Sequence, residues 1–371
     1  MAENDYALIV GLQNYPGLGD PKLGGPEFDA LQFEKWVKCP NGGAVPADHI
    51  DRILSSDYIQ PQLPIPPLRN TRPAEAEIVN VLYKLRDISM DNIQNGRGPR
   101  IGNRLYIYMS GHGISPTTFG DLTSEECALL MSDVDDSLKR VPRYHIAGNY
   151  VASWFSKNNC FAEVFLFMDC CRDNTQVPAV NMCFPPTGNS DETKRFLAYA
   201  AKPSRRAKEM IINGKPQGVF TRALLMALRG AAAVPDPKSP VQGYITFESL
   251  QSFLINNMRY LLDPQFANDP DIQEPNVRFY PDNSPKTVVI PAPVQSFPVT
   301  IEAIPGAVDD IVIYSSALKT IVQRINAQDL PKVVALPREE YMIIAKTPDI
   351  VTIPLSVKGI EGAINQLCNY D

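Results

Sequence analysis

Short apolar runs and longer amphipathic stretches follow one another along the first two thirds of the chain. Runs of mainly apolar residues, bounded by polar or turn-forming residues, are typical of buried strands and lie at residues 6–10, 104–110, 164–168 and 196–201. A more polar run at residues 48–54 fits one further short strand. Apolar spacing and capping residues predict helices at residues 26–37, 71–88, 149–157, 219–229 and 247–262. The pattern therefore predicts an α/β fold.

The pattern changes after residue 262. Residues 263–285 are rich in Pro, Asp and Asn, which is typical of a linker. Short β-type runs follow between turns, with one predicted helical insert at residues 317–327. We therefore expect a large α/β domain at residues 1–285 and a small β-sandwich-like domain at residues 286–371. A length of 371 residues agrees with one large and one small domain.

The charge balance and the absence of apolar spans narrow the class of partner. The net charge of -6 argues against a nucleic acid or an anionic membrane surface. No apolar run is long enough to span a bilayer. The chain begins with Met1-Ala-Glu-Asn-Asp-Tyr6, and these acids stand where a secretory signal would carry basic residues. We expect a cytoplasmic protein that binds neither nucleic acid nor a membrane.

The seven cysteines do not form a metal-binding pattern. No pair of CxxC motifs occurs, so we expect no structural zinc site. Adjacent Cys170 and Cys171 would make a strained disulfide, and without an export signal we expect reduced thiols. Asp133, Asp135 and Asp136 match only the beginning of an EF-hand loop, so a solvated turn is a better interpretation than a cation site. We expect no metal and no cofactor.

Two predicted strands end in residues that are suited to nucleophilic catalysis. One runs into Gly111-His112-Gly113, and the other into Asp169-Cys170-Cys171-Arg172-Asp173. Ligands and chemistry collect at the carboxyl ends of strands in open α/β sheets, and neighbouring parallel strands would bring these two ends together. A cysteine attacks as its thiolate, which a nearby base such as His112 would generate. However, an isolated buried cysteine is usually inert, so the residues alone leave both interpretations open.

Other polar residues receive structural interpretations. His49 lies in the predicted strand at residues 48–54, where we expect a structural role. His145 follows an Arg-rich polar stretch and is expected at the surface. Residues 202–218 form a basic segment that we expect to be flexible.

The ordered motifs resemble the caspase-like clan of cysteine peptidases, and within it the metacaspases and the bacterial orthocaspases. A strand ending in Ser110-Gly-His-Gly113 precedes a strand ending in Asp169-Cys-Cys171, which is the family's order. Three further stretches resemble the family. Residues 6–15 resemble its opening strand and loop, and residues 23–30 resemble its helix entry, L-x-G-x-x-x-D-A. Residues 218–230 resemble its late helix, and residues 243–246 resemble the start of the next segment. The matches cover roughly residues 5–262, and the ordered set is specific.

This resemblance implies a caspase-like sandwich, with a central, mostly parallel sheet flanked by helices, and a cysteine endopeptidase activity. It implies Cys171 as the nucleophile and His112 as the base, and the backbone N–H groups of Gly113 and Cys171 are the natural oxyanion donors. It places Asp169 in the S1 pocket, where Glu209 is a weaker candidate. The expected substrate is a protein or peptide with Arg or Lys at P1, because a buried carboxylate selects a cation.

The resemblance leaves several alternatives open. Cys170 is expected on the opposite side of the strand end from Cys171, in a buried position. Arg172-Asp173-Asn174 replace the His-Ser-Gly that usually follows the metacaspase nucleophile. A caspase-like scaffold without activity, acting through protein–protein contacts, is the alternative function. Residues 202–215 are either a solvated face or a site of self-processing.

The family also suggests a biological process, which the residues themselves do not indicate. It implies stress, defence or cell-death signalling, with a regulatory protein as a partner of the C-terminal domain. A requirement for calcium stays open.

Overall fold

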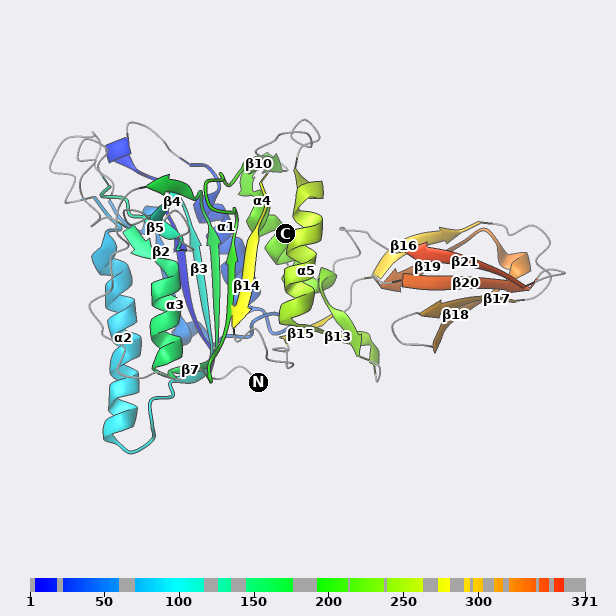
Figure 1. The fold of residues 1–371 in the computed structure, drawn as a ribbon, viewed down its shortest axis with the longest axis horizontal. Helices are drawn as coiled ribbons and strands as arrows, with labels where there is room; N and C mark the ends of the chain where they lie inside the picture. Colours follow the sequence, from blue (N-terminus) through cyan, green and yellow to red (C-terminus); the bar gives the residue numbers. More distant parts are fainter. Residues whose placement is uncertain are drawn as a thin grey trace.

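The structure is a computed structural model that describes most of the chain. The described residues are 4–18, 23–59, 71–116, 126–134, 145–175, 192–212, 214–236, 239–262, 273–280, 290–293, 296–302, 310–315, 320–337, 340–346 and 350–356. They form a larger body of helices and strands and a smaller body of strands (Figure 1).

A six-stranded sheet forms the centre of the larger body (Figure 1). Its strands lie in the order β14-β9-β7-β3-β1-β2, and all neighbours are parallel except β14, which is antiparallel to β9. The strands are β1 Tyr6–Gly11, β2 Ile50–Leu54, β3 Gly102–Ser110, β7 Phe161–Asp169, β9 Lys194–Tyr199 and β14 Asn276–Tyr280. The predicted α/β architecture with a central, mostly parallel sheet is confirmed.

Helices cover both faces of this sheet, which explains why the inner strands β1, β3, β7 and β9 are largely apolar. One face packs on α1 (Pro26–Lys38), α4 (Val219–Met226) and α5 (Phe247–Asn257). The other face packs on α2 (Glu75–Gln94) and α3 (Gly148–Lys157). Successive residues of a strand point to opposite faces, so Phe165 and Phe167 join the first core whereas Val164 and Leu166 join the second. Each such buried side chain contributes roughly 1.5–3 kcal/mol.

Short helical turns complete the helical structure of the larger body. They are η1 Pro16–Leu18, η2 Ala47–His49, η3 Ser55–Asp57, the wider π-type turn η6 Ala227–Ala231, and η7 Met258–Leu261. Thr246 caps α5, because its hydroxyl accepts a hydrogen bond from the Ser249 N–H at 3.1 Å. In the part of the chain that the structure describes, no helix has both the length and the apolar character needed to cross a bilayer.

Smaller sheets lie around the central one. A four-stranded sheet in the order β6-β5-β4-β8 consists of β4 Gly113–Pro116, β5 Ala128–Leu130, β6 His145–Ala147 and β8 Asp173–Thr175. A hairpin pairs β10 Glu209–Ile212 with β11 Lys215–Gly218. A three-stranded sheet contains β12 Val234–Asp236, β13 Ser239–Ile245 and β15 Ile290–Pro293.

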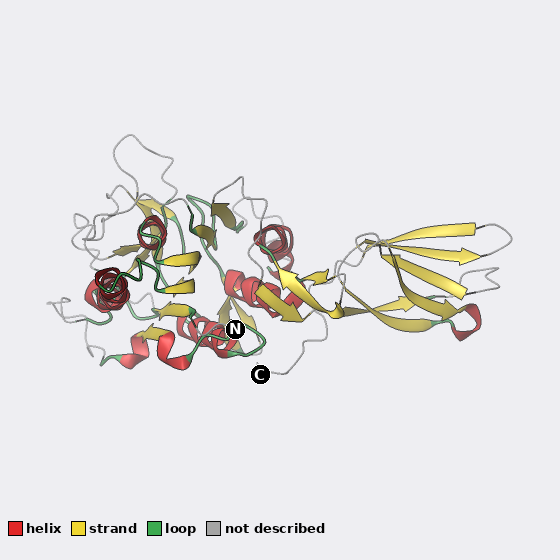
Figure 2. Cartoon of the chain, turned by 90° about the horizontal axis from the view of Figure 1, so that it is seen from below, coloured by secondary structure: helices red, strands yellow, loops and turns green. Residues whose placement is uncertain are grey.

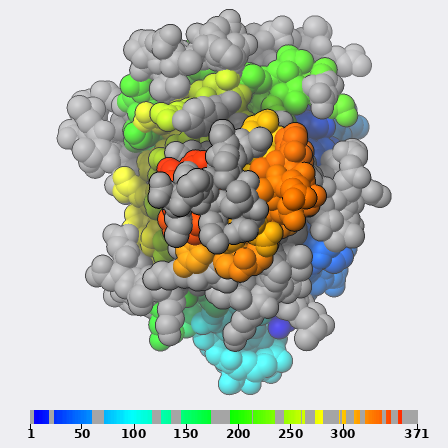
Figure 3. Space-filling view, turned by 90° about the vertical axis from the view of Figure 1, so that its right-hand side faces the viewer, coloured from blue at the N-terminus to red at the C-terminus, as the bar shows by residue number. Residues whose placement is uncertain are grey.

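The smaller body is made of two sheets with a shared apolar core (Figure 2). One pairs β16 Ser296–Ile301 with β19 Lys332–Pro337, and the other has the order β18-β17-β20-β21. Its strands are β17 Asp310–Ser315, β18 Thr320–Asn326, β20 Glu340–Lys346 and β21 Ile350–Ser356, and the turn η9 Ala327–Asp329 follows β18. Ile301 and Leu336 of the first sheet pack with Ile313 and Ile343 of the second. Figure 3 views the molecule from this end, where these strands lie in front of the larger body.

Three predictions of local structure are wrong. The helical insert at residues 317–327 is instead largely strand β18, whose branched residues pair with β17. The linker at residues 263–285 contains β14, which completes the central sheet as an antiparallel edge strand. The flexible segment at residues 202–218 contains the β10–β11 hairpin, closed at Gly214 with φ +76°. In each case pairing with a neighbouring strand determines the local structure, against the preference that the local composition indicates.

The division into domains at residue 285 stays a prediction. β15 follows that boundary in the sequence but pairs with β13 of the larger body, from Gln242 opposite Pro293 to Ile245 opposite Ile290. Contacts with the larger body therefore continue to residue 293.

Candidate active site

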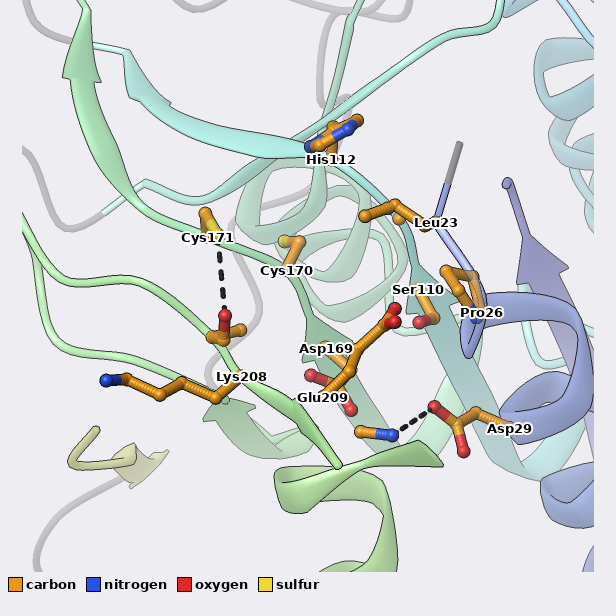
Figure 4. A pocket seen from close by; sticks show the side chains of 13 residues that line it. Leu23, Pro26, Asp29, Ser110, His112, Asp169, Cys170, Cys171, Lys208 and Glu209 are labelled. Carbon is orange, nitrogen blue, oxygen red and sulfur yellow. Dashed lines mark hydrogen bonds between the residues drawn. The ribbon is translucent and has the colours of Figure 1, made fainter. Parts of the chain in front are cut away.

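The candidate site forms where β3 and β7 end side by side. Ser110 lies opposite Asp169 in the register of these parallel neighbours. The Gly111 N–H donates a hydrogen bond to the Asp169 carbonyl oxygen at 3.2 Å, which joins the two strand ends. His112 and Cys171 each follow two residues later, and both line one cavity of about 70 Å³ that is partly open to solvent (Figure 4). The two strand ends therefore meet, as the sequence predicts.

A second sheet continues from both strand ends. β4 begins at Gly113, directly after His112, and β8 begins at Asp173, two residues after Cys171. β4 and β8 are parallel, with Ile114 opposite Asp173. The two segments that leave the site are thus hydrogen-bonded to each other. Sequence analysis missed this sheet, because strands of three or four residues are too short to show alternation.

Tyr15 fixes the main chain at His112. The Tyr15 hydroxyl accepts a hydrogen bond from the His112 N–H at 2.9 Å, and the two rings meet edge-on with 4.8 Å between centroids. Gly111 has a φ of +155°, and a Cβ atom there would lie 2.2 Å from the Tyr15 hydroxyl. Only glycine therefore allows the tyrosine to approach the turn. The sequence contained a signal for Tyr15, since it ends the stretch that resembles the family's opening loop.

The Cys171 thiol is half-buried and faces the wall of the cavity. Its Sγ donates a hydrogen bond to the Ala207 carbonyl oxygen at 3.8 Å, which Figure 4 draws as the dashed line that begins at Cys171. Burial raises the pKa of Cys171, and the nearby charges of Asp173 and Asp169 raise it further. In this arrangement the thiol is protonated at neutral pH, so its use as a nucleophile requires a base.

Cys170 packs on Cys127 rather than on Ala207, and it also borders the cavity that Cys171 lines. It is 1% exposed, and its Sγ lies 3.4 Å from the Sγ of Cys127. The Cys127 thiol raises the pKa of Cys170, and burial raises it further. Gly113 packs against this turn so closely that a Cβ atom would lie 2.6 Å from the Cys170 sulfur and 2.8 Å from the Cys171 carbonyl oxygen. The backbone at Gly113 therefore runs beside that of Cys171.

Three carboxyl groups line the same cavity as the thiol and the imidazole: Asp29, Asp169 and Glu209 (Figure 4). Asp169 Oδ2 accepts hydrogen bonds from the Thr221 hydroxyl at 2.6 Å and the Thr221 N–H at 3.1 Å. Asp29 Oδ2 accepts one from the Gly218 N–H at 2.8 Å. We call Asp29, Asp169 and Glu209 the acidic floor.

Glu209 holds the edge of the acidic floor to the start of α1. Its carboxylate oxygens accept hydrogen bonds from the N–H groups of Gly24 and Gly25, at 3.3 and 3.2 Å. These residues directly precede Pro26, the first residue of α1, so the positive end of the helix dipole favours the carboxylate. Glu209 is exposed, unlike the two aspartates.

Burial makes the charged forms of both aspartates unfavourable. It raises the pKa of Asp169 to about 6, and the Glu209 charge adds to the effect. Burial and the neighbouring Asp169 charge hold the pKa of Asp29 well above its usual range. Asp29 Oδ1 is buried and has no hydrogen-bond partner among the described residues. A cation in the cavity would stabilise the ionised floor and could supply that partner.

Sequence analysis identified Asp169 and Glu209 as pocket acids but missed Asp29. The signal was present, because Asp29 is the Asp of the stretch that resembles the L-x-G-x-x-x-D-A helix entry. What the sequence did not reveal is that α1 brings this residue to the end of β7.

The two residues after Cys171 have opposite environments. Arg172 is completely buried, whereas the Asp173 side chain is 51% exposed and forms an ion pair with the exposed Arg206 at 3.5 Å. The basic segment also has a fixed main chain here, because Ser204 N–H and Arg205 O both hydrogen-bond to Arg172 at 2.9 Å.

The other histidines lie outside the site. His145 is 3% exposed in β6, opposite Leu130 of β5, so the expectation of a surface position is wrong. Burial lowers the pKa of His145 to about 4. His49 stacks on Tyr6, with 4.1 Å between centroids, and its Nδ1 lies 3.1 Å from the Asp5 carbonyl oxygen. That environment agrees with a structural role.

Two expectations about side-chain chemistry need correction. Asp133 is only 8% exposed rather than solvated, and burial raises its pKa to about 6. Asp135 and Asp136 lie outside the described residues, within which no cluster of three or more His, Cys, Asp or Glu side chains is arranged to hold a metal ion. Cys39 is disulfide-bonded, so the expectation of reduced thiols is wrong for it. Free thiols are found at Cys127, Cys160, Cys170 and Cys171.

Comparisons with known proteins find a relative that is described as a protease, and solved structures that are loosely similar to this chain. No protein-family model matches the chain. A protein described as "Probable protease", from a Desulfuromonadales bacterium, is 26% identical over 238 residues, which are 61% of this chain and 26% of that protein. The chain thus spans about a quarter of the length of this relative.

Two solved structures have TM-scores below 0.5 with this chain. Caspase-1 from Spodoptera frugiperda has a TM-score of 0.41 at 12% identity, over 75% of this chain and 86% of that one. A protein from Geobacter sulfurreducens has a TM-score of 0.42 at 13% identity, over 74% of this chain and 93% of that one.

Proposed function

We propose that the protein is a caspase-like cysteine endopeptidase that cleaves after Arg or Lys. The observation that carries this proposal is the shared cavity, which is lined by two cysteines, an imidazole and three carboxyl groups. Cys171 is the nucleophile and His112 the base. The relative described as a probable protease supports a peptidase, although the chain spans only part of that protein.

The proposed reaction begins with a rotation of the Cys171 side chain. The thiol leaves the Ala207 carbonyl oxygen, transfers its proton to His112, and attacks the scissile carbonyl carbon. The N–H groups of Gly113 and Cys171 then stabilise the oxyanion by roughly 3 kcal/mol each. His112 protonates the leaving amine, and water hydrolyses the thioester. The close approach of Gly113 to the Cys171 backbone supports the pairing of these two donors.

The acidic floor supports the proposed specificity. The guanidinium of a P1 arginine would donate to Asp169 and to the unpartnered Oδ1 of Asp29, while Glu209 adds charge at the rim. Arginine suits this arrangement better than lysine, because its planar fork can donate to two carboxylates at once. An acidic P1 residue would be repelled.

Self-processing, a calcium requirement and a regulatory partner are further parts of the proposal. Cleavage directly after Arg205 finds little support, because its carbonyl oxygen is already hydrogen-bonded to Arg172. Cleavage after Lys215 finds little support as well, because Pro216 follows it and both residues are paired in the β10–β11 hairpin. A regulatory protein that binds the C-terminal strands and a calcium requirement are proposals that rest on the resemblance, and a cytoplasmic location is a proposal that rests on the sequence pattern.

Fluorogenic peptides with Arg, Lys, Ala or Asp at P1 test the proposal. The wild-type protein should cleave the Arg and Lys peptides, and Cys171→Ala and His112→Ala should each lower kcat by at least about 10³-fold. Cys160→Ala and His49→Ala are matched controls far from the cavity, and both should retain activity. Wild-type-like turnover by Cys171→Ala would contradict the mechanism.

The alternative is a caspase-like scaffold that binds partners without cleaving them. The observation that favours it is the protonated thiol turned toward Ala207. An arginine chloromethylketone discriminates the two functions. Covalent labelling of Cys171, lost in His112→Ala, supports the peptidase, and an intact folded protein that is never labelled supports the scaffold.

A further inference from the structure

Arg172 directly follows the proposed nucleophile and lies buried between other elements of the site. Its side chain is 0% exposed. The guanidinium donates hydrogen bonds to the carbonyl oxygens of Glu126 at 3.1 Å and Ala201 at 3.5 Å. It also packs on the Tyr199 ring, with Cζ 4.8 Å from the centroid. Glu126 lies just before β5, while Tyr199 and Ala201 lie at the end of β9, so one side chain joins the Cys171 turn to both elements.

The main chain of Arg172 is held as well. Its N–H donates to the Arg205 carbonyl oxygen, and its own carbonyl oxygen accepts from the Ser204 N–H, both at 2.9 Å. This segment leads into Ala207, whose carbonyl oxygen accepts the hydrogen bond from the Cys171 thiol. Arg172 and the Cys171 thiol are thus hydrogen-bonded to the same segment, residues 204–207.

The Glu126 side chain lies in the electrostatic field of the buried guanidinium, which lowers the pKa of its carboxyl group, although burial raises that pKa overall to about 7. Its carboxylate accepts hydrogen bonds from the N–H groups of Cys127 at 3.0 Å and Asn149 at 2.8 Å, and the charges of Glu126 and Arg172 attract each other. Apolar residues of similar volume are often as stabilising as a buried ion pair. Stability alone therefore does not account for an arginine at this position.

We propose that Arg172 is a positioning residue, which holds the Cys171 thiol and the Cys171 N–H in the geometry that attack on the substrate requires. This inference rests on the proposed peptidase function. The described residues that line the cavity include the acidic floor but not Arg172. Replacing Arg172 should therefore reduce kcat while leaving the binding of a cation in the cavity unchanged.

The first experiment compares Arg172→Lys and Arg172→Met with the wild-type full-length protein. We expect kcat to fall about 10-fold in Arg172→Lys and about 100-fold in Arg172→Met, because a misplacement of about 1 Å can cost that much. Benzamidine, a small cation that probes the acidic floor alone, should keep its inhibition constant within about twofold. A folded Arg172→Met protein with wild-type kcat would overturn the proposal.

A double variant separates positioning from stability. At pH 8, above the Glu126 pKa of about 7, Arg172→Met leaves the buried Glu126 carboxylate without a nearby cation, which should lower the melting temperature. Adding Glu126→Gln removes that charge while keeping an acceptor for Cys127 and Asn149, so the melting temperature should recover while kcat stays low. Recovery of kcat together with the melting temperature would reduce Arg172 to a purely structural residue.

Arg104→Met is the matched control. Arg104 lies at the amino end of β3, where it forms a 2.7 Å ion pair with the partly buried Glu163. Its replacement should lower the melting temperature and leave kcat unchanged. An equal fall of kcat in Arg104→Met and Arg172→Met would show that the loss comes from general destabilisation, against the proposal.

The rate at which iodoacetamide alkylates Cys171 tests the role of Arg172, and this measurement does not depend on peptidase activity. Release of the turn should free the Cys171 thiol from Ala207 and speed its alkylation about fivefold or more in Arg172→Met. Failure of the wild-type protein to cleave any peptide would refute the proposed function, and the alkylation rate would then decide the role of Arg172. An unchanged rate in that case overturns the positioning proposal.

Discussion

At the scale of single residues, Asp29 and Asp169 lie in one buried space beside Cys171. Two carboxylates in such a space repel each other and lose hydration, which is why the pKa of each lies above its usual value. Hydrogen bonds from Gly218 and Thr221 offset only part of that cost. A cation that enters the space replaces the missing stabilisation, so the pair is suited to selecting a basic side chain.

Removal of either charge should weaken this selection. Asp29→Asn and Asp169→Asn keep the side-chain size but remove one negative charge, and each should lower kcat/KM for an Arg peptide by roughly 10–100-fold. The measurement is kcat/KM for matched Arg and Ala peptides. Asp5→Asn, which changes a buried aspartate at the amino end of the sheet, is the control and should keep the preference. An unchanged Arg/Ala ratio in both floor variants would refute the role of the floor.

At the scale of elements, the small sheet β6-β5-β4-β8 supports both strand ends of the central sheet. β4 carries the chain away from His112, β8 carries it away from Cys171, and the two strands pair in parallel. The loop at His112 and the turn at Cys171 are thereby linked behind the site. Gly113 lies at the closest contact between them, since nothing larger than hydrogen fits beside Cys170.

Gly113→Ala should therefore separate the two strand ends. The added methyl group meets the Cys170 sulfur and the Cys171 carbonyl oxygen, and such overpacking typically costs about 1–3 kcal/mol of unfolding free energy. We expect kcat to fall by at least about 10-fold, because the oxyanion donors move apart. Urea unfolding and peptide cleavage measure the two effects. Ile107→Val in the core of β3 should cost about 1 kcal/mol without loss of kcat, and an active Gly113→Ala protein would contradict this account.

At the scale of the whole molecule, several acids are buried in places where they hold protons more strongly than in an unfolded chain. Burial raises the pKa of Asp5, Asp133 and Asp169 to about 6, and that of Glu126 to about 7. Below pH 4 both states bind these protons, and between about pH 4 and 7 the folded state binds more of them. The folding stability that these groups contribute is therefore lost as the pH rises through that range.

Thermal unfolding should thus shift to lower temperature from pH 5 to pH 8, by roughly 5 °C or more at constant ionic strength. His145 acts in the opposite direction, because burial lowers its pKa to about 4 and its protonation below pH 6.5 favours the unfolded chain. One histidine opposes these four carboxyl groups and Asp29, whose pKa also lies well above its usual range, so the acids should dominate. Asp5→Asn should flatten the profile between about pH 4 and 6. A melting temperature that rises from pH 5 to pH 8 would contradict the assignment.

The apolar strands of the central sheet could be predicted from the sequence, and so could the meeting of the reactive residues that follow two of them. The runs that became β1, β3, β7 and β9 are apolar because helices cover both faces of the sheet, and such runs have few other uses in a globular chain. The positions of His112 and Cys171 after two such runs made their meeting predictable, since adjacent parallel strands end at the same edge. The separation of Cys170 from Cys171 also follows from the alternation of a strand.

Only the tertiary structure decided which distant residues complete the site. Asp29 comes from α1, Tyr15 from the loop after β1, and Glu126 from the segment before β5, and no local pattern relates them to the strand ends. The same holds for β14 and β18, whose polar or mixed sequences became strands because a neighbouring strand was available. Arg172 shows the difference most clearly. Its sequence position beside Cys171 indicated only an unexplained departure from the resembled family, whereas its buried contacts with Glu126, Ala201 and Tyr199 exist only once three separate segments have packed around it.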